Sequence, residues 1–191
     1  MLAAGGSKRL GAPKQLLPYG AGPLLGHVLG VARQCEFDQL LCVLGGNAGE
    51  VRDQVDLGGV EIVENVAFGE GCSSSIAIGL QALDPDCDTL VLMLGDQPGV
   101  EPSTVAQLLA GRDDAPFAAC AYDNGRGHPL AFARSTFSEL AALHGDKGVW
   151  KLLDRRAGEV VDVSIAGPVP LDVDTWEDYE AALAVRRNVH S

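Results

Sequence analysis

The sequence predicts an α/β fold: a single-domain, Rossmann-like and mostly parallel sheet with helices on both faces. Three observations support this fold class. Short apolar runs alternate along the chain with stretches of helical spacing. Glycine-containing turns follow several of these runs, as at Gly45 and Gly95. The 191 residues, 47% of them hydrophobic, are enough for one domain with a sizeable core.

The expected strands are short apolar runs that end in turn residues. The first is confined to residues 1–4, so it is either very short or continues upstream of Met1. The run that ends at Leu94 is the clearest, because Gly95 and Asp96 terminate it. The strands are expected over residues 1–4, 40–44, 60–63, 89–94 and 117–121.

Helical spacing predicts the helices that cover this sheet. In the first half they are expected over residues 23–34, 50–55, 73–83 and 102–109. The second half is less regular: we expect a loop entering a strand over 127–132, helices over 135–143 and 147–155, a short strand over 171–174 and a final helix over about 176–186. Ligands of such sheets gather at the carboxyl ends of the strands, where the turn at residues 5–7 and Asp96 fall.

Composition and charge narrow the possible functions. The net charge of -12 argues against nonspecific nucleic-acid binding, which needs a basic surface. No apolar run approaches the length of a membrane span, and glycines and charges appear too early for a signal peptide. The five cysteines form no C-x-x-C pair, which favours free thiols in a reducing cytoplasm.

The first fourteen residues combine a glycine-containing turn with three cations. After the turn at residues 5–7 come Lys8, Arg9 and Lys14. The glycines let backbone N–H groups approach phosphate oxygens, an arginine grips such oxygens with a fork, and a lysine acts as a point charge. Neither a Walker A loop nor a dinucleotide fingerprint matches this spacing. The loop therefore predicts a triphosphate site of another kind, against the alternative of a surface turn with solvated cations.

Three aspartates are candidate metal ligands. Asp96 follows the clearest strand and is placed to hold Mg²⁺, although an aspartate before Pro98 is also a common turn residue. Asp172 and Asp174 alternate along a predicted strand, so both face the same side. Asp174 precedes Thr175, a candidate cap of the last helix, and a purely capping role for Asp174 is the alternative.

Two further segments carry motif-like patterns. Residues 65–76 read N-V-A-F-G-E-G-C-S-S-S-I, in which a tight glycine loop leads into serines that open a helix. Such a helix start can receive an anion or a base edge, or the serines can simply cap the helix. His128 lies in the G-H-P segment, and G-D-K-G follows at residues 145–148. A reactive thiol at Cys72 has no adjacent histidine or base to support it.

Together these segments resemble the molybdenum cofactor cytidylyltransferase family, which belongs to the MobA-like NTP transferase superfamily. The resemblance rests on L-A-A-G-x-S-x-R-x-G-x-x-K at the start, on G-D-x-P around Asp96, on D-V-D-T before the last helix and on the N-x-x-x-x-x-G-x-x-S-S stretch. It runs from Leu2 to about Tyr179. It implies the nucleotide-diphospho-sugar transferase type of fold over one domain, residues 1–191. It also implies transfer of CMP from CTP to the terminal phosphate of molybdopterin, with release of pyrophosphate.

The resemblance also implies a set of site residues. The catalytic residues would be Arg9, Lys14 and Asp96, and Mg²⁺ would be bound by Asp96 and Asp174. The acceptor would be met by His128, Pro129 and Lys147. The nucleotide would contact Leu2, Ala3, Ala4, Gly5, Gly6, Ser7, Arg9, Lys14, Asn65, Gly71, Ser73 and Ser74.

Three alternatives to this function stay open. The first is a nucleotidyltransferase with another phosphorylated acceptor, such as a sugar phosphate. The second is an oxidoreductase, since some homologues of this group carry such a label, although the chain has no flavin or nicotinamide fingerprint. The third is a noncatalytic protein that delivers a nucleotide or cofactor to a molybdenum enzyme. A molybdenum hydroxylase apo-enzyme is an expected partner.

Overall fold

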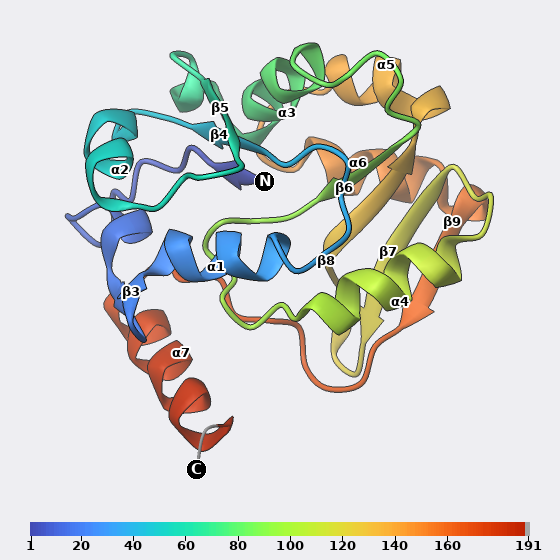
Figure 1. Ribbon diagram of the computed structural model, residues 1–191. Helices are drawn as coiled ribbons and strands as arrows, with labels where there is room; N and C mark the ends of the chain where they lie inside the picture. Colours follow the sequence, from blue (N-terminus) through green and yellow to red (C-terminus); the bar gives the residue numbers. More distant parts are fainter. Residues whose placement is uncertain (190–191) are drawn as a thin grey trace.

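A computed structural model describes residues 1–189 and shows a mainly parallel sheet covered by helices on both faces (Figure 1). In spatial order the strands are β5, β4, β1, β6, β8, β7 and β9, and only β8 runs against its neighbours. Their bounds are β1 (Leu2–Ala3), β4 (Leu41–Leu44), β5 (Glu61–Glu64), β6 (Thr89–Leu92), β7 (Phe117–Tyr122), β8 (Gly125–Ala133) and β9 (Val160–Ser164).

The two-residue strand β1 joins the two halves of the sheet. On one side it pairs with β4, where Leu2 lies opposite Val43. On the other side the N–H of Leu2 donates to the carbonyl of Met93 at 2.9 Å, and the N–H of Gly95 donates to the carbonyl of Leu2 at 2.8 Å. These bonds place the loop that follows β1 beside the loop that follows β6.

Two layers of helices bury the alternating side chains of the strands. On one face lie α1 (Leu24–Ala32), α2 (Ala48–Gln54) and α4 (Pro102–Arg112); on the other lie α3 (Cys72–Gln81), α5 (Phe137–Ala141) and α6 (Gly148–Arg155). Along β7, Phe117 and Ala119 join the core under α5 and α6, whereas Ala118 and Cys120 join the core under α4. This period of two explains why the strands read as continuous apolar runs: both of their faces are buried.

The last helix, α7 (Trp176–Val189), packs beside a small hairpin formed by β2 (Pro18–Tyr19) and β3 (Gly22–Pro23) (Figure 1). The hydroxyl of Tyr179 donates to the carbonyl of Pro18 at 2.5 Å. The shared core of this region contains Leu10, Leu17, Tyr19, Leu24, Val173 and Ala182. The packing holds the segment just before α7 against the N-terminal loop.

The predicted fold class is confirmed, and two local predictions are wrong. The segment over 127–132 is not a loop entering a strand, because β8 already begins at Gly125. His128 and Pro129 form a bulge within it, since the partners along β7 step from Leu130 to Gly127. The segment 171–174 forms no strand: its backbone pairs with no neighbour in the sheet. The β2–β3 hairpin and strand β9 were not predicted.

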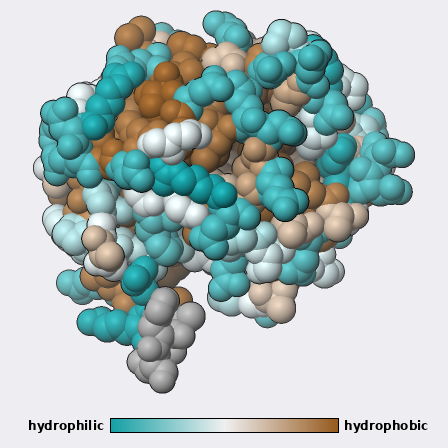
Figure 2. All heavy atoms as spheres, in the orientation of Figure 1, coloured by the Kyte–Doolittle hydropathy of each residue, from teal (hydrophilic) through white to brown (hydrophobic). Residues whose placement is uncertain are grey.

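Figure 2 shows apolar atoms gathered mainly in the upper left part of this face of the molecule. A separate observation is a hollow of about 490 Å³ at the amino ends of β1, β4 and β6, whose apolar members include Met1, Leu40, Leu90 and Val91. Its charged lining residues are all acidic: Glu36, Asp38, Asp84, Asp86 and Asp88. Such a lining repels phosphate. Within residues 1–189, no helix has the length and apolar character needed to cross a bilayer.

Candidate functional site

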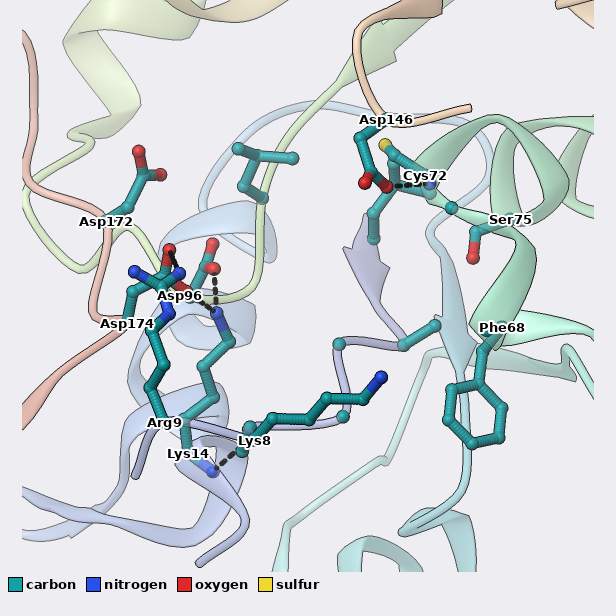
Figure 3. A pocket seen from close by; sticks show the side chains of 18 residues that line it. Lys8, Arg9, Lys14, Phe68, Cys72, Ser75, Asp96, Asp146, Asp172 and Asp174 are labelled. Atoms are coloured by element: carbon teal, nitrogen blue, oxygen red, sulfur yellow. Dashed lines mark hydrogen bonds and ion pairs between the residues drawn. The ribbon is translucent and has the colours of Figure 1, made fainter. Parts of the chain in front are cut away.

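A cavity of about 570 Å³ opens at the carboxyl ends of β1 and β6 (Figure 3). Its walls come from the N-terminal loop, the loop after β6, the loop that leads into α3 and the segment before α7. The residues predicted for the phosphate and metal sites that line it are Leu2, Ala4, Gly5, Gly6, Ser7, Arg9, Lys14, Gly71, Asp96 and Asp174. Segments far apart in the sequence thus meet in one site.

Two cations and two carboxylates form the charged cluster of this cavity. The Lys14 ammonium donates to Oδ2 of Asp96 at 2.5 Å and to Oδ1 of Asp174 at 2.7 Å. The Arg9 guanidinium donates to Oδ2 of Asp174 at 2.5 Å. The side chain of Lys14 is only 10% exposed, whereas that of Arg9 is 65% exposed. Lys14 is therefore the buried centre of the cluster, and Arg9 lies at its solvent side.

The cluster sets the protonation states of its members. Burial alone would lower the pKa of Lys14, but the charges and hydrogen bonds of Asp96 and Asp174 together raise it above its ordinary value. Burial alone would raise the pKa of Asp174, but hydrogen bonds and charge from Lys14 and Arg9 hold it below the usual range. For neighbouring Asp172, burial and the charge of Asp96 raise the pKa to about 6. The Lys14–Asp174 pair is thus ionised at neutral pH.

A strained turn shapes the N-terminal loop. Ser7 has φ of 48°, a left-handed conformation that is uncommon outside glycine, and its carbonyl accepts from the N–H groups of Leu10 and Gly11. Its hydroxyl accepts from the N–H of Lys14 at 2.9 Å. Backbone strain of this kind persists where surrounding contacts enforce it, and it clusters at functional sites. The turn fixes the directions in which the loop's cations leave the backbone.

Hydrogen bonds from the side chain of Gln15 hold the start of this loop in place. Its buried amide donates to the carbonyl of Ala3 at 2.7 Å and to that of Gly5 at 3.1 Å. The carbonyl of Ala3 is thus committed to the scaffold, and Ala3 does not line the cavity, whereas Ala4 and Gly5 do. Of the residues at the start of this loop that are predicted to contact the nucleotide, Leu2, Ala4 and Gly5 thus line the cavity and Ala3 does not.

The positions of Asp96 and Asp174 follow from packing around them. Gly95 lies so close to β1 that an added Cβ would be 2.9 Å from the Cβ of Ala3, so the turn before Asp96 has no room for a side chain. The N–H of Val173, whose side chain is fully buried, donates to the carbonyl of Asp96 at 3.0 Å. This bond joins the two aspartate-bearing segments, and Asp172 and Asp174 both line the cavity on either side of Val173.

The last helix begins with a reciprocal cap, as its sequence indicates. The N–H of Asp178 donates to the hydroxyl of Thr175 at 3.2 Å, and the N–H of Thr175 donates back to the Asp178 carboxylate at 2.8 Å. Thr175, and not Asp174, is thus the capping side chain. The carboxylate of Asp174 is left for the charged cluster.

The donor set suits a magnesium-type ion. Two carboxylates from separate segments converge on one point, and Mg²⁺ in phosphate sites is held by one or two carboxylates together with substrate oxygens and waters. Among residues 1–189, no group of three or more His, Cys, Asp or Glu side chains is gathered as a metal site. The residues therefore fit an ion that binds together with a phosphate ligand and do not form an all-protein cage.

The serine segment is arranged differently from its predicted contacts. The amide of Asn65 donates to the hydroxyls of Ser74 and Ser75, each at 2.9 Å. Ser73 donates to the carbonyl of Gly145 at 2.5 Å, and Ser74 donates to the carbonyl of Gly71 at 2.8 Å. The side chains of Asn65, Ser73 and Ser74 thus brace the loop and lie outside the cavity lining, while the next serine, Ser75, lines it.

Asp146 closes the cavity on the side of α3. Its carboxylate accepts from the N–H of Cys72 at 3.0 Å, and Figure 3 shows the two residues together at one end of the cavity. Gly71 has φ of 101°, and a Cβ there would lie 2.8 Å from Oδ1 of Asp146, so glycine is required at this contact. Burial, with smaller effects of Asp146 and Asp96, raises the pKa of Cys72 to about 11, which leaves a protonated thiol.

The predicted acceptor residues lie outside the cavity lining. Lys147 is exposed and directly follows Asp146, the member of the G-D-K-G segment that does line the cavity. His128 packs edge-on against Trp150, with 5.4 Å between ring centroids, and Tyr122 donates to its carbonyl at 2.7 Å. Burial lowers the pKa of His128 to about 4, so the ring is neutral at physiological pH.

Several lining residues were outside the predicted set of site residues, although the sequence analysis had noted Lys8 as a loop cation and Asp172 as a neighbour of Asp174. They are Lys8, Phe68, Gly69, Cys72, Ser75, Leu94, Asp146 and Asp172. The position of Lys8 between Ser7 and Arg9, which are both predicted to contact the nucleotide, could have indicated that it lines the cavity. Phe68 and Asp146 stand in two of the motif-like segments, but nothing in either pattern singled out these side chains, because each reaches the cavity through contacts between distant segments.

A glycine turn with cations, facing paired aspartates at the carboxyl edge of an α/β sheet, defines a protein that handles nucleoside triphosphates. Residues 1–160 match the MobA-like NTP transferase domain, and the chain belongs to that family of nucleotidyltransferases. This membership confirms the family resemblance found in the sequence.

Characterised relatives carry more than one name. The chain is 31% identical over 188 residues to nicotine blue oxidoreductase of Paenarthrobacter nicotinovorans, covering 93% of this chain and 91% of that protein. It is 50% identical to a crystal structure of the Rv0371c homologue from Mycobacterium sp. strain JC1, with a TM-score of 0.91 and coverage of 98% and 95%. A structure of Rv0371c of Mycobacterium tuberculosis H37Rv in complex with manganese is 45% identical, with a TM-score of 0.84 and coverage of 96% and 95%.

More distant structures share the fold alone. A CMP:2-keto-3-deoxy-manno-octonic acid synthetase complexed with CTP is 19% identical, with a TM-score of 0.80 over 98% of this chain and 97% of the other. The chain thus has the predicted nucleotide-diphospho-sugar transferase type of fold.

Proposed function

We propose that this nucleotidyltransferase moves CMP from CTP to the terminal phosphate of a molybdopterin-type cofactor and releases pyrophosphate, with Mg²⁺ as its metal. One observation carries the proposal: Lys14, Arg9, Asp96 and Asp174 form a single charged cluster at the wall of a cavity large enough for a nucleotide. The family membership supports nucleotidyl transfer, and the sequence motifs support the cytidylyl and pterin parts.

The reaction requires no protein nucleophile. An oxygen of the acceptor phosphate attacks the α-phosphorus of CTP, and the new P–O bond forms as the bond to the bridging oxygen of the β-phosphate breaks. The electron pair of that bond leaves with pyrophosphate. The protein holds the two substrates in line and stabilises the charge that accumulates on the leaving group. Lys14 and Arg9 supply that positive charge from the cluster.

Asp96 and Asp174 would hold the divalent ion, which when bound neutralises phosphate charge and orients the phosphates. The manganese complex of the related mycobacterial protein supports a divalent metal in this family. Both carboxylates are engaged by Lys14 in the described structure, so Lys14 and the ion share ligands. Release of the ammonium from these carboxylates would free it for the leaving phosphates.

The nucleotide would lie along the N-terminal loop and the start of α3. The backbone from Ala4 to Ser7 and Gly71 form the wall that it meets, and Ser75 and Phe68 line the same side. Asn65, Ser73 and Ser74 act through the hydrogen bonds that hold this wall in place. The CTP complex of a protein with the same fold supports a cytidine nucleotide as the first one to test.

The acceptor would enter beside Asp146. Lys147 follows that residue at the surface, where its ammonium can meet an acceptor phosphate, and His128 with Pro129 shapes the bulge of β8 that packs on Trp150 of α6. A molybdenum hydroxylase apo-enzyme is the proposed recipient of the finished cofactor. The net charge of -12 supports a small-molecule acceptor over nucleic acid, and the cytoplasm stays our prediction for its location.

One relative has a name that indicates a different function, and the experiment must therefore distinguish the two. Nicotine blue oxidoreductase aligns along nearly the whole chain, so a redox activity is the main alternative to nucleotidyl transfer. A sugar phosphate acceptor and a noncatalytic delivery role are the other two. These possibilities differ in their products.

The experiment measures pyrophosphate release with each of the four NTPs, with and without molybdopterin, and with a sugar phosphate in its place. We expect release with CTP and molybdopterin only. Lys147→Ala should raise the KM of the acceptor and leave that of CTP unchanged, while Lys151→Ala on the exposed side of α6 is the matched control. Transfer to a sugar phosphate alone would overturn the acceptor, and redox turnover without pyrophosphate would overturn the class of reaction.

A further inference from the structure

We infer that Lys8 is the cation that first binds the polyphosphate chain of the incoming nucleotide. This rests on the proposed function and adds a residue to it. Lys8 lies between Ser7 and Arg9, at a position that the N-terminal motif L-A-A-G-x-S-x-R leaves unspecified. It lines the cavity, and Figure 3 shows its side chain extended between the charged cluster and Phe68.

The distribution of ion pairs singles out Lys8. Lys14 is engaged by Asp96 and Asp174, and Arg9 is engaged by Asp174. Within residues 1–189, Lys8 has no carboxylate within ion-pair distance, and it is the remaining cation of the cavity lining. An unpaired ammonium can meet an incoming phosphate without first breaking an ion pair. The paired cations become available only once their carboxylates take another partner.

The loop geometry explains why two neighbouring cations have different roles. The left-handed Ser7 begins a tight turn that closes with the N–H groups of Leu10 and Gly11 on its carbonyl. Across this turn Arg9 leaves toward Asp174, while Lys8 leaves toward the open part of the cavity (Figure 3). The anchor of Ser7 on the N–H of Lys14 ties both directions to the same strained conformation.

Salt screening makes the charges close to the cavity the important ones for an incoming triphosphate. The protein has a net charge of -12, but at 0.1 M salt exposed charges more than about 10 Å away are largely screened. An exposed cation at the mouth of the cavity attracts the triphosphate locally, as Lys8 is placed to do. The buried Lys14 cannot, because two carboxylates already offset its charge.

Binding of inorganic tripolyphosphate, measured by titration calorimetry in EDTA, tests this role without base, acceptor or metal. The variants are Lys8→Met, Lys8→Arg and, as a control of equal charge change, Lys151→Met on exposed α6. Because Lys8→Met loses one charge-assisted contact, its affinity for tripolyphosphate should be about tenfold lower than that of the wild type. Lys8→Arg should restore most of the affinity, and Lys151→Met should bind as the wild type does. Thermal unfolding of each variant checks that the fold is kept.

Pyrophosphate release from CTP by the same wild-type preparation separates this inference from the proposed function. Suppose that the wild type turns over CTP, but Lys8→Met and the wild type bind tripolyphosphate with equal affinity. The role of Lys8 is then overturned, and the proposed function stands. An equal loss in Lys151→Met would also overturn the role of Lys8, because net charge would then explain the effect. If the wild type neither binds tripolyphosphate nor turns over CTP, both fall together.

Discussion

The ammonium nitrogen of Lys14 lies 2.5 Å from Oδ2 of Asp96, across 82 positions of sequence. The pair links the N-terminal loop to the loop after β6, and only 10% and 18% of the two side chains is exposed. A lysine buried to this degree is stable as a cation only with such a partner. The pair therefore holds the N-terminal loop and the proposed metal ligands together before any substrate binds.

Lys14→Ala should cripple turnover far more than folding. Removing a cation that stabilises the leaving phosphates should lower kcat/KM for pyrophosphate release by about 100-fold or more. In the absence of nucleotide, the same variant should bind Mn²⁺ more tightly by electron paramagnetic resonance, because its carboxylates no longer share a competing ammonium. Near-normal turnover would show that the phosphate role is wrong, and weaker Mn²⁺ binding would show that the ammonium does not compete.

Asp96→Asn should abolish metal-dependent activity while sparing the sheet. The substitution keeps the side chain's size but removes one of two carboxylates that Mg²⁺ would use. Pyrophosphate release measured against magnesium concentration should show no saturable rise, while Asp154→Asn on the exposed side of α6 should behave as the wild type does. A magnesium dependence unchanged by Asp96→Asn would remove this residue from the metal site.

His128 should make the fold sensitive to mild acid. Burial lowers its pKa to about 4, below the ordinary value of about 6.5, so the unfolded chain binds more protons between these values. The stability that the neutral ring contributes is complete above about pH 6.5 and is lost as the pH falls toward 4. Between about pH 7 and pH 5, urea unfolding should show a loss of stability larger by about 2 kcal/mol in the wild type than in His128→Asn. Equal losses in the two proteins would contradict the buried, neutral state of the ring.

Cys72 should react slowly although it lines the cavity. Burial raises the pKa of its thiol to about 11, so the thiolate that attacks alkylating reagents is scarce at neutral pH. With iodoacetamide near pH 7.5, peptide mass spectrometry should show Cys72 modified at least about tenfold more slowly than a cysteine in a model peptide. Fast labelling of Cys72, suppressed by CTP, would instead indicate a reactive thiol in the site.

The sequence was most informative for features that depend on the local pattern of residues within one segment. The alternation of strands and helices predicted the parallel sheet, and the carboxyl-end rule predicted that Asp96 would meet the N-terminal loop. Thr175 was recognised as a cap for the same local reason. Asp172 and Asp174 share a side even though their segment is irregular, because the extended backbone still alternates around buried Val173.

Contacts between segments that are far apart along the chain could not be predicted from the sequence. Asn65 and Ser73 looked like ligand-binding residues, yet their polar atoms are taken by Ser74, Ser75 and Gly145. His128 reads as part of a loop, but pairing with β7 makes it a strand bulge. Buried polar groups are nearly always hydrogen-bonded, and the tertiary fold decides which neighbour each of them bonds to. That neighbour cannot be found from the local sequence.

Transfer of label from α-labelled CTP tests the central claim, that the cluster of Lys14, Asp96 and Asp174 catalyses nucleotidyl transfer. The wild type is incubated with Mg²⁺ and molybdopterin, the labelled acceptor and pyrophosphate are quantified together, and Lys14→Ala and Asp96→Asn are run in parallel. The account predicts equal amounts of labelled acceptor and pyrophosphate from the wild type, and rates of formation of both products that are lower by about 100-fold or more in the variants. Label transfer at near-wild-type rates in both variants, or a wild type that releases no pyrophosphate, would contradict it.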